Sequence, residues 1–397
     1  MKICHVTPHL PPDQAANALL PFHLGCWARE SGGEAVYVAY AARMGSSGRA
    51  PELPGPVTWI PSDHNRRGII KTMKLARVIA AARIMRLATP AVEEADIVHL
   101  HSNGLLTEVV SMLAARKNKP VVMTLYGTEI WHYRPKRWGP DLFTRAYRRA
   151  AHVTFYSEAL QQRAITVGLA RRETSIIYPP VAPQFERRNF AGQSRARAEL
   201  GLRNQHILVN VKRLHPLAGQ RYLIEALGEV IRTHPDTRLI VCGTGPLLDD
   251  LKAAARSAGV EGHVTFAGLV DNRAVARYDM AADVFVLPSL LEACPTVALE
   301  ALACGTPVIS SDNPGGMELN DLFGIDVAIV PKENAMALAR AIVELLDNKR
   351  RARGATADLI EREFRPAAVA GRFAAVYDRA LQRRAESPEL VPADQAR

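Results

Sequence analysis

Residues 284–312 read VFVLPSLLEACPTVALEALACGTPVISSD, and this stretch decides the fold. The apolar run at 284–287 predicts a buried strand. Pro295 suits the first turn of a helix, and good helix formers follow it as far as Cys304. Gly305 is expected in a left-handed cap, and the apolar residues 307–310 predict a second strand. A strand, a helix and a strand in this order predict a parallel α/β sheet.

Two carboxylates flank the start of this helix. Glu292 lies in the loop before it and Glu300 lies inside it. The free N–H groups at the start of a helix favour an anion such as phosphate. Carboxylates accept hydrogen bonds from hydroxyls, which sugars and ribose present in pairs. The segment therefore predicts a phosphate cradle between two carboxylates; the alternative is a crossover helix with two solvated glutamates.

The sequence pattern around Glu292 and Glu300 resembles the Glu-x7-Glu motif of the retaining glycosyltransferases of family 4. It covers Pro288-Ser289, Glu292, Glu300-Ala301 and residues 304–309. The resemblance implies the GT-B fold, an α/β architecture of two Rossmann-like, doubly wound parallel-sheet domains that face a central cleft. It also implies that Glu292 contacts the donor sugar and Glu300 the ribose.

The resemblance extends to other donor-binding residues of the second half. It implies that the chain at Pro295, Thr296 and Val297 meets the diphosphate and sugar. It further implies that the turn with Gly243 and Gly245 borders the donor, and that the backbone near Leu269 and Val270 holds the base. For the glycine turn alone, a merely structural tight turn is the alternative, because Leu248 occupies the third glycine position of the dinucleotide fingerprint.

The cations of the site depart from the family pattern. The family has G-R-L, three residues and then K-G, and here Arg213 matches the Arg, Lys212 replaces the Gly, and Ala218 stands in place of the Lys. Loss of a cation beside a departing diphosphate weakens transition-state stabilisation. Four explanations remain open: Lys212 or another cation substitutes, the donor sits differently, the protein is not a standard transferase, or Ala218 is an engineered replacement of the Lys. The candidate catalytic residues are Arg213, Glu292 and Lys212; a surface ion pair is the alternative for Arg213.

The first half departs from the family as well. Its first loop ends at Asn17 without the family's paired glycines, and Tyr126 stands where the family has a His that touches the donor sugar. The residues expected on the acceptor or sugar side are His101, Tyr126, Gly127, Glu129 and Asn17.

His99 and His101 alternate on one predicted strand, where they could bind a metal, line the acceptor cleft or pack in the sheet. No Asp-x-Asp occurs in the sequence, so we expect no metal in the reaction.

The composition is that of a globular protein with anionic partners. The chain has 397 residues, 48% of them hydrophobic, with a net charge of +10 and five scattered cysteines. Such a charge favours phosphates, nucleic acid or an anionic membrane surface. Two basic stretches, 66–86 and 134–149, could contact anionic lipid or be solvated faces. No known nucleic-acid-binding motif is recognised in the sequence, so nucleic acid is not favoured as a partner. We expect a cytoplasmic protein without a signal peptide, peripheral at the inner face of the membrane.

Alternating strands and helices predict two domains. The expected divisions are residues 1–184 for the acceptor side, 185–365 for the nucleotide-sugar side, a helix at 366–385 that crosses back to the first domain, and a disordered tail at 386–397. A polar, arginine-rich linker is expected at 186–197. A basic helix is expected at 69–87 and a continuous helical pattern at 357–384.

The sequence thus predicts a retaining, metal-independent glycosyltransferase without a cofactor. It would move a sugar from a nucleotide sugar, a UDP- or GDP-sugar, to a sugar, lipid-linked or small-molecule hydroxyl acceptor in bacterial glycan, glycolipid or polysaccharide biosynthesis. Two alternatives remain open: a catalytically weak GT-B protein that binds a sugar nucleotide or glycan, and a GT-B enzyme that uses a simple sugar phosphate.

Overall fold

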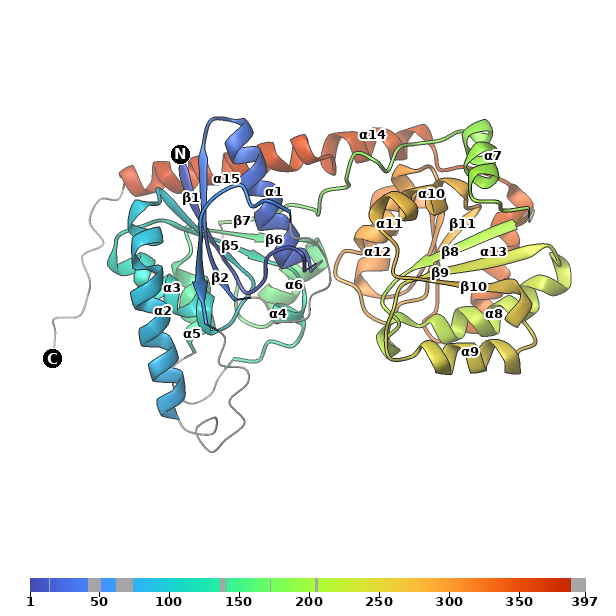
Figure 1. Ribbon diagram of the computed structural model, residues 1–397, viewed down its shortest axis with the longest axis horizontal. Coiled ribbons are helices and arrows are strands. Elements are labelled where there is room, and N and C mark those ends of the chain that lie inside the picture. Colours follow the sequence, from blue (N-terminus) through green and yellow to red (C-terminus); the bar gives the residue numbers. More distant parts are fainter. Residues whose placement is uncertain are drawn as a thin grey trace. The chain divides into compact units, whose positions relative to one another are not determined.

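The computed structural model describes residues 1–13, 15–41, 51–61, 74–135, 139, 141–171, 173–203 and 206–386. The chain forms two compact units, Met1–Ile177 with Ala370–Arg397, and Tyr178–Val369 (Figure 1). The expected tail beyond residue 386 lies outside the described residues, as do Arg66, Arg67, Lys71, Lys136 and Arg137 of the two basic stretches.

The first unit is built on a parallel sheet with the strand order β3-β2-β1-β4-β5-β6-β7. The order reverses between β1 and β4, which are neighbours in the sheet although β2 and β3 separate them in the chain. Its strands are β1 (Lys2–Thr7), β2 (Glu34–Tyr40), β3 (Val57–Ile60), β4 (Ile97–His101), β5 (Val121–Leu125), β6 (His152–Phe155) and β7 (Thr174–Ile176). Its helices are α1 (Ala16–Glu30), α2 (Lys74–Glu94), α3 (Leu105–Arg116), α4 (Thr128–Trp131), α5 (Leu142–Arg149), α6 (Glu158–Thr166) and the later part of α15 (Pro366–Glu386).

The second unit repeats this plan with the strand order β10-β9-β8-β11-β12-β13. Here the order reverses between β8 and β11. Its strands are β8 (His206–Val211), β9 (Thr237–Cys242), β10 (Val264–Gly268), β11 (Val284–Leu287), β12 (Val308–Ser311) and β13 (Val327–Val330). Its helices include α7 (Phe190–Glu199), α8 (Gln220–Thr233), α9 (Leu248–Ser257), α10 (Asn272–Ala281), α11 (Thr296–Ala303), α12 (Pro314–Phe323), α13 (Ala335–Asn348) and α14 (Gly354–Glu363).

Strand β11 is covered on both faces. Phe285 and Leu287 belong to one hydrophobic cluster, and Val284 and Val286 to the other. Successive side chains of a strand point to opposite faces, so each cluster lies on its own side of the sheet. A strand buried on both faces has a continuous apolar sequence, and this is why 284–287 could be recognised from the sequence.

The prediction of two Rossmann-like parallel-sheet domains is confirmed, and the strand, helix and strand expected between residues 284 and 310 are observed as β11, α11 and β12. Several expectations were wrong. Helix α2 continues through Pro90 to Glu94, and the continuous pattern at 357–384 is two helices, α14 and α15. The expected linker at 186–197 contains most of α7, whose first turn is capped by Asn189: its Oδ1 accepts from the Gly192 N–H at 3.0 Å.

Helix α12 was not predicted at all. Its sequence begins Pro-Gly-Gly, a poor helix former, yet Asn313 Oδ1 caps the Gly316 N–H at 3.0 Å and Pro314 occupies the first turn. An Asn cap followed by Pro is a helix start signal that outweighs the glycines.

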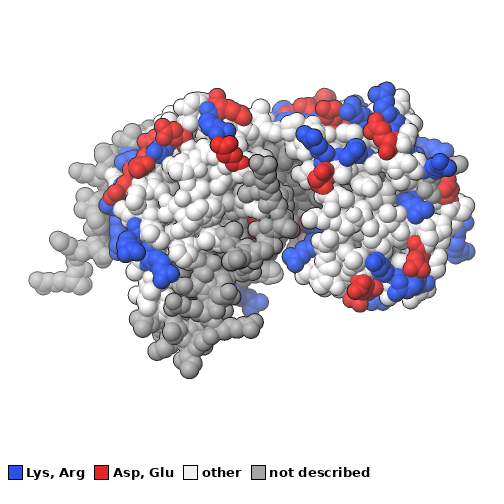
Figure 2. All heavy atoms as spheres, viewed as in Figure 1, with Lys and Arg blue, Asp and Glu red and all other residues white. Residues whose placement is uncertain are grey.

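Charged side chains of both signs lie on the visible face of the second unit (Figure 2). Figure 2 shows Lys and Arg interspersed with Asp and Glu over the second unit in that view. Among the described residues, no helix is both long and apolar enough to cross a membrane.

Candidate active site

The predicted donor residues gather where the strand order of the second sheet reverses. Lys212 and Arg213 follow β8, and the loop with Glu292 follows β11, its neighbour in the sheet. In open α/β sheets, ligands bind outside the carboxyl ends of the strands at such a switch point. Residues far apart in the sequence therefore meet at the position where a ligand is expected.

Lys212 and Glu292 form an ion pair across this switch point. Lys212 Nζ lies 2.6 Å from Glu292 Oε1, and the side chains are 31% and 9% exposed. An ammonium has three N–H donors, so contact with one carboxylate leaves donors for a ligand. The pair places a cation, and not only a carboxylate, in the loop region that the sequence assigns to the donor.

Arg213 and Ala218 differ sharply in their surroundings. Arg213 is exposed, and its guanidinium has no partner among the described residues. Ala218 is 3% exposed and ends a short 3-10 helix, Pro216–Ala218. The next residue, Gly219, has a φ of 67°, and a Cβ there would lie 2.0 Å from the Pro288 carbonyl oxygen. The backbone after Ala218 thus packs tightly against the end of β11, and a long side chain at Ala218 has little room.

The glycine turn after β9 packs against the same cation-bearing loop. A Cβ at Gly243 would lie 2.1 Å from the Lys212 carbonyl oxygen, and one at Gly245 would lie 2.1 Å from that of Leu214. Gly243 also has a φ of 142°, which L side chains rarely adopt. Both glycines therefore let two backbones touch, and this contact positions Lys212 and Arg213.

The start of α11 offers unpaired backbone donors. Pro295 is the cap residue and supplies no side-chain hydrogen bond, and the N–H groups of Thr296 and Val297 have no partner among the described residues. The loop before the helix is held from α12, because the Gly315 N–H donates to the Glu292 carbonyl at 3.1 Å. A helix start with free donors and a fixed entry loop is suited to an anion.

Glu300 shares its surroundings with an acid that the sequence analysis missed. Burial raises the pKa of Glu300 to about 8. Asp279 is fully buried, and neither of its carboxylate oxygens has a hydrogen-bond partner in the part of the chain that the structure describes. Burial, followed by the proximity of Glu300, raises the pKa of Asp279 well above the usual range. Asp279 lies on the buried face of α10 with Val275 and Ala276, so helical periodicity would have marked it as an acid facing the core.

The two residues proposed to lie near the base follow β10. Leu269 is 80% exposed, whereas Val270 is partly buried against the core. The preceding Gly268 accepts a hydrogen bond from the Gly243 N–H at 2.7 Å, so this loop and the glycine turn are joined through their backbones.

In the first unit, a chain of hydrogen bonds runs from β1 to Tyr126. His5 Nδ1 lies 3.0 Å from His101 Nε2, and His101 Nδ1 lies 2.7 Å from the Tyr126 hydroxyl. His5 and His101 are fully buried, and they lie on β1 and β4, at the switch point of this sheet. Burial lowers the pKa of His5 to about 3 and that of His101 well below its usual range, so both rings are neutral.

The other residues expected on the acceptor side have mainly backbone roles. Both oxygens of Glu129 accept backbone N–H groups, at 3.3 Å from Tyr126 and 2.8 Å from Gly127. Glu129 therefore shapes the turn that presents Tyr126. The Asn17 carbonyl accepts from the Thr7 hydroxyl, and its side chain has no partner among the described residues.

His99 completes a cluster of three buried histidines. Nitrogens of His5, His99 and His101 lie within 4.8 Å of one another, which makes a metal site conceivable by distance. However, His99 already has the Tyr377 hydroxyl at 2.8 Å from Nδ1 and the Thr124 hydroxyl at 2.7 Å from Nε2. These contacts favour a packed hydrogen-bond network, because a buried divalent charge needs charge compensation that the hydroxyls do not supply.

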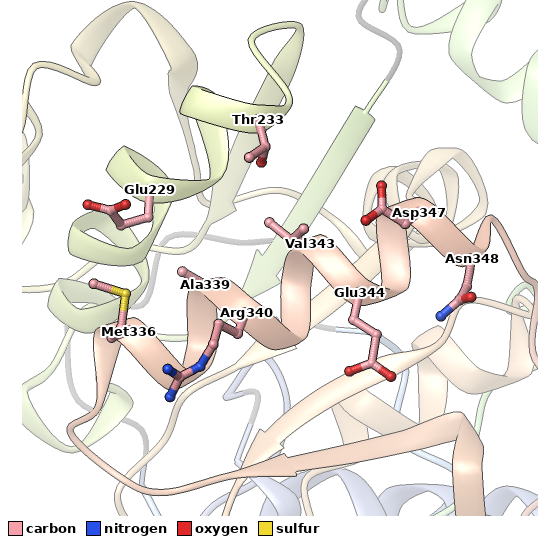
Figure 3. Close-up of a pocket in the computed structure, with 9 residues that line it drawn as sticks. All are labelled: Glu229, Thr233, Met336, Ala339, Arg340, Val343, Glu344, Asp347 and Asn348. Atoms are coloured by element: carbon pink, nitrogen blue, oxygen red, sulfur yellow. The ribbon is translucent and has the colours of Figure 1, made fainter.

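A pocket of about 580 Å³ lies elsewhere, between α8 and α13 (Figure 3). Its lining includes Glu229, Met336 and Arg340, and it contains none of the predicted site residues.

Comparison with known proteins gives two family matches that together span most of the chain. Residues 193–361 match the glycosyl transferases group 1 family, and residues 26–185 match glycosyltransferase family 4. The putative teichuronic acid biosynthesis glycosyltransferase TuaC of Bacillus subtilis is 30% identical over 73% of this chain and 68% of its own length. The chain belongs to the family 4, group 1 glycosyltransferases.

Two further comparisons define how far this likeness reaches. A GDP-mannose-dependent α-(1-6)-phosphatidylinositol monomannoside mannosyltransferase of Mycolicibacterium smegmatis is 35% identical, but the match spans only 40% of this chain and 44% of that relative. The structure of Anabaena HepE in complex with UDP and glucose has a TM-score of 0.73 and 21% identity, over 95% of this chain and 99% of that one. The glycosyltransferase therefore has the GT-B fold, as its sequence predicts.

Proposed function

We propose that this glycosyltransferase is retaining and metal-independent and moves a sugar from a UDP- or GDP-sugar to a hydroxyl acceptor. The observation that carries the proposal is the Lys212–Glu292 ion pair at the switch point of the second sheet, 2.6 Å long and beside the open start of α11. This arrangement supports a site that binds hydroxyls and an anionic phosphate next to each other.

In the proposed site, cations and helix amides hold the diphosphate. Arg213 and Lys212 contact the phosphates together with the N–H groups at the start of α11, and the glycine turn fixes the cation loop. As the leaving phosphate gains charge, these donors stabilise the transition state more than the ground state. Lys212 thereby takes the role of the Lys that other family members have at the position of Ala218.

Glu292 and Glu300 would bind the donor's hydroxyls. When a donor enters, sugar hydroxyls donate to Glu292 while Lys212 turns its remaining N–H groups to the phosphate. Glu300 binds the two ribose hydroxyls in its ionised form, which has four acceptor positions.

Retention follows from attack on the face that the leaving group vacates. The bond from the anomeric carbon to the phosphate oxygen breaks, the acceptor oxygen bonds to that carbon on the same face, and its proton passes to the departing phosphate. This mechanism, which the family resemblance implies, requires no protein base and no metal.

Tyr126 is proposed to donate a hydrogen bond to the donor sugar or the acceptor. His5 Nε2 is buried without a partner, and buried N–H groups without an acceptor are rarer than under-satisfied acceptors. If His5 Nε2 is therefore a lone pair, His5 Nδ1 donates to His101 Nε2, and His101 Nδ1 donates to the Tyr126 oxygen. The Tyr126 hydroxyl proton is then free for the substrate.

The named relatives support an acceptor in bacterial glycan, glycolipid or polysaccharide synthesis, because their names refer to teichuronic acid and to a phosphatidylinositol mannoside. A peripheral contact with an anionic membrane is part of this proposal. Helix α5 exposes Arg145, Arg148 and Arg149 and buries Phe143 and Tyr147, so its outer face is cationic.

Calorimetric titration with a panel of UDP-, GDP- and ADP-sugars tests the proposal, with transfer then assayed for any donor that binds. Binding of one UDP- or GDP-sugar, weakened in Arg213→Ala, is expected. Tight binding of a simple sugar 1-phosphate with no binding of any nucleotide sugar would contradict it.

A further inference from the structure

Two adjoining hollows on the second unit are lined by arginines. One, of about 670 Å³, is bounded by the start of α7 and the loop before α14, and the other, of about 540 Å³, lies between α7 and α10. They share Arg188, Gly192 and Arg195, so we treat them as one surface, the arginine pocket. Its arginines are Arg187, Arg188, Arg195, Arg273, Arg277 and Arg351. Hollows of this size are typical of small-molecule sites.

The charge of the arginine pocket is poorly compensated. Glu199 is the one acid in its lining. Arg188 pairs with Glu186 at 2.9 Å, where both side chains are about half exposed. Arg195, Arg273 and Arg277 form no ion pair with any residue that the structure describes. Cations held together repel one another, and a bound anion would relieve this repulsion.

Arg351 forms a fixed part of the lining. Its guanidinium donates to the carbonyls of Ala282 and Cys304, each at 2.7 Å, and its buried Nε has no hydrogen-bond partner among the residues that the structure describes. Burial lowers the pKa of Arg351 to about 10, so the neutral carbonyls compensate its charge only in part. A planar guanidinium held in one orientation is suited to phosphate.

The arginine pocket is separate from the proposed donor site. Arg351 contacts Cys304, which caps the carboxyl end of α11, whereas the proposed diphosphate lies at the amino end of that helix. Helix α11 has eight residues, which corresponds to a length of about 12 Å. The arginines of the pocket are thus not used by the sugar-transfer site.

We propose that the arginine pocket binds a phosphate-bearing ligand, as a second anion site of this enzyme. The phosphate could belong to a soluble phosphorylated metabolite or to the headgroup of a phospholipid. Phe190 lines the pocket and is 56% exposed, so an apolar ring is available beside the cations for the remainder of the ligand.

The first arm of the test is titration of the full chain with inorganic pyrophosphate by calorimetry. Arg188→Ala/Arg195→Ala removes the two arginines that both hollows share, and Arg221→Ala/Arg256→Ala removes the same charge from exposed positions elsewhere on the unit. We expect the pocket variant, but not the control, to lose about tenfold or more in affinity for pyrophosphate, because it lacks two charge-assisted contacts to the phosphates. Both pocket arginines lie at the surface, so an unchanged melting temperature is expected.

The second arm uses sedimentation with phosphatidylcholine vesicles that contain phosphatidylglycerol. Loss of vesicle binding in the pocket variant, with pyrophosphate binding unchanged, would support the phosphate of a lipid headgroup as the ligand. Equal behaviour of the pocket variant and the control with both probes would overturn the proposal. Arg213→Ala, titrated in the same way, reports on the donor site. If this substitution leaves pyrophosphate binding unchanged, the donor-site proposal fails, whereas the proposal for the arginine pocket still stands.

Discussion

Replacing Lys212 with Ala should damage catalysis far more than stability. The ammonium lies 2.6 Å from a carboxylate that is only 9% exposed, but it is itself 31% exposed. A charge-assisted contact of this kind is worth about 1.5–3 kcal/mol, and screening by solvent reduces the expected loss of stability to about 1–2 kcal/mol. For a unit of this size, such a loss lowers Tm by about 2–8 °C.

The expected catalytic loss is larger, because Lys212 is proposed to face the leaving phosphate. Removal of one such preorganised donor lowers kcat by about 10²–10³-fold, or about 2.7–4 kcal/mol. The assay is kcat and KM for the donor that the panel identifies, measured with thermal unfolding for the wild type, Lys212→Ala and Lys212→Arg. Lys212→Arg keeps a cation and should recover much of the lost rate.

A double-mutant cycle with Glu292→Gln separates the two roles of Lys212. If Lys212 only neutralises Glu292, its removal should matter little once Glu292 is uncharged, both for Tm and for kcat. We expect the effect of Lys212→Ala on Tm to become small in the Glu292→Gln background, whereas its effect on kcat should persist there. A Lys212→Ala enzyme with a lowered Tm and a kcat within about twofold of the wild type would refute the reasoning.

Three further predictions follow from the same geometry. Ala218→Lys should leave kcat unchanged or lower it, because Ala218 is 3% exposed and Lys212 already supplies the cation. A large gain in kcat would show instead that the wild type lacks a cation beside the phosphate. The nucleotide-sugar affinity of the wild type should rise with pH through about 8, the pKa to which burial raises Glu300, because only the ionised carboxylate accepts both ribose hydroxyls. The folded state also holds that proton more tightly than the unfolded state, so Tm should fall as pH rises from about 4.5 to about 8; Glu300→Gln should reduce both slopes, and unchanged slopes would remove Glu300 from the site. Sedimentation with anionic vesicles should weaken with salt and in Arg145→Ala/Arg148→Ala, and equal binding to neutral vesicles at high salt would contradict a charge-driven contact.

The sequence predicted the fold well where local signals were strong. Helix α11 was predicted to within about one residue, because Pro295 suits a first turn and Gly305 follows the end of the helix. Strand β11 was predicted because both its faces are buried. By contrast, α7 was taken for a linker because its arginines concealed a short buried face of Gln193 and Ala196.

The contacts of the proposed site residues could not be predicted from the sequence. The Lys212–Glu292 pair depends on β8 and β11 being neighbours, which no local pattern specifies. In the same way, His5 contacts His101 only because β1 lies next to β4. Glu129 was expected to face a ligand, whereas its carboxylate binds the backbone of the turn. Long-range pairing in the sheet determines each of these contacts.

The measurement that tests the central claim most directly is the anomeric configuration of the product. Wild-type enzyme would be incubated with the donor and acceptor that the panel identifies, in buffer containing EDTA, and the product followed by proton NMR from the first turnovers. The account predicts transfer at an undiminished rate with the donor's anomeric configuration retained, and transfer strongly reduced in Lys212→Ala. An inverted product, or transfer that stops in EDTA and resumes when a divalent metal is restored, would contradict it.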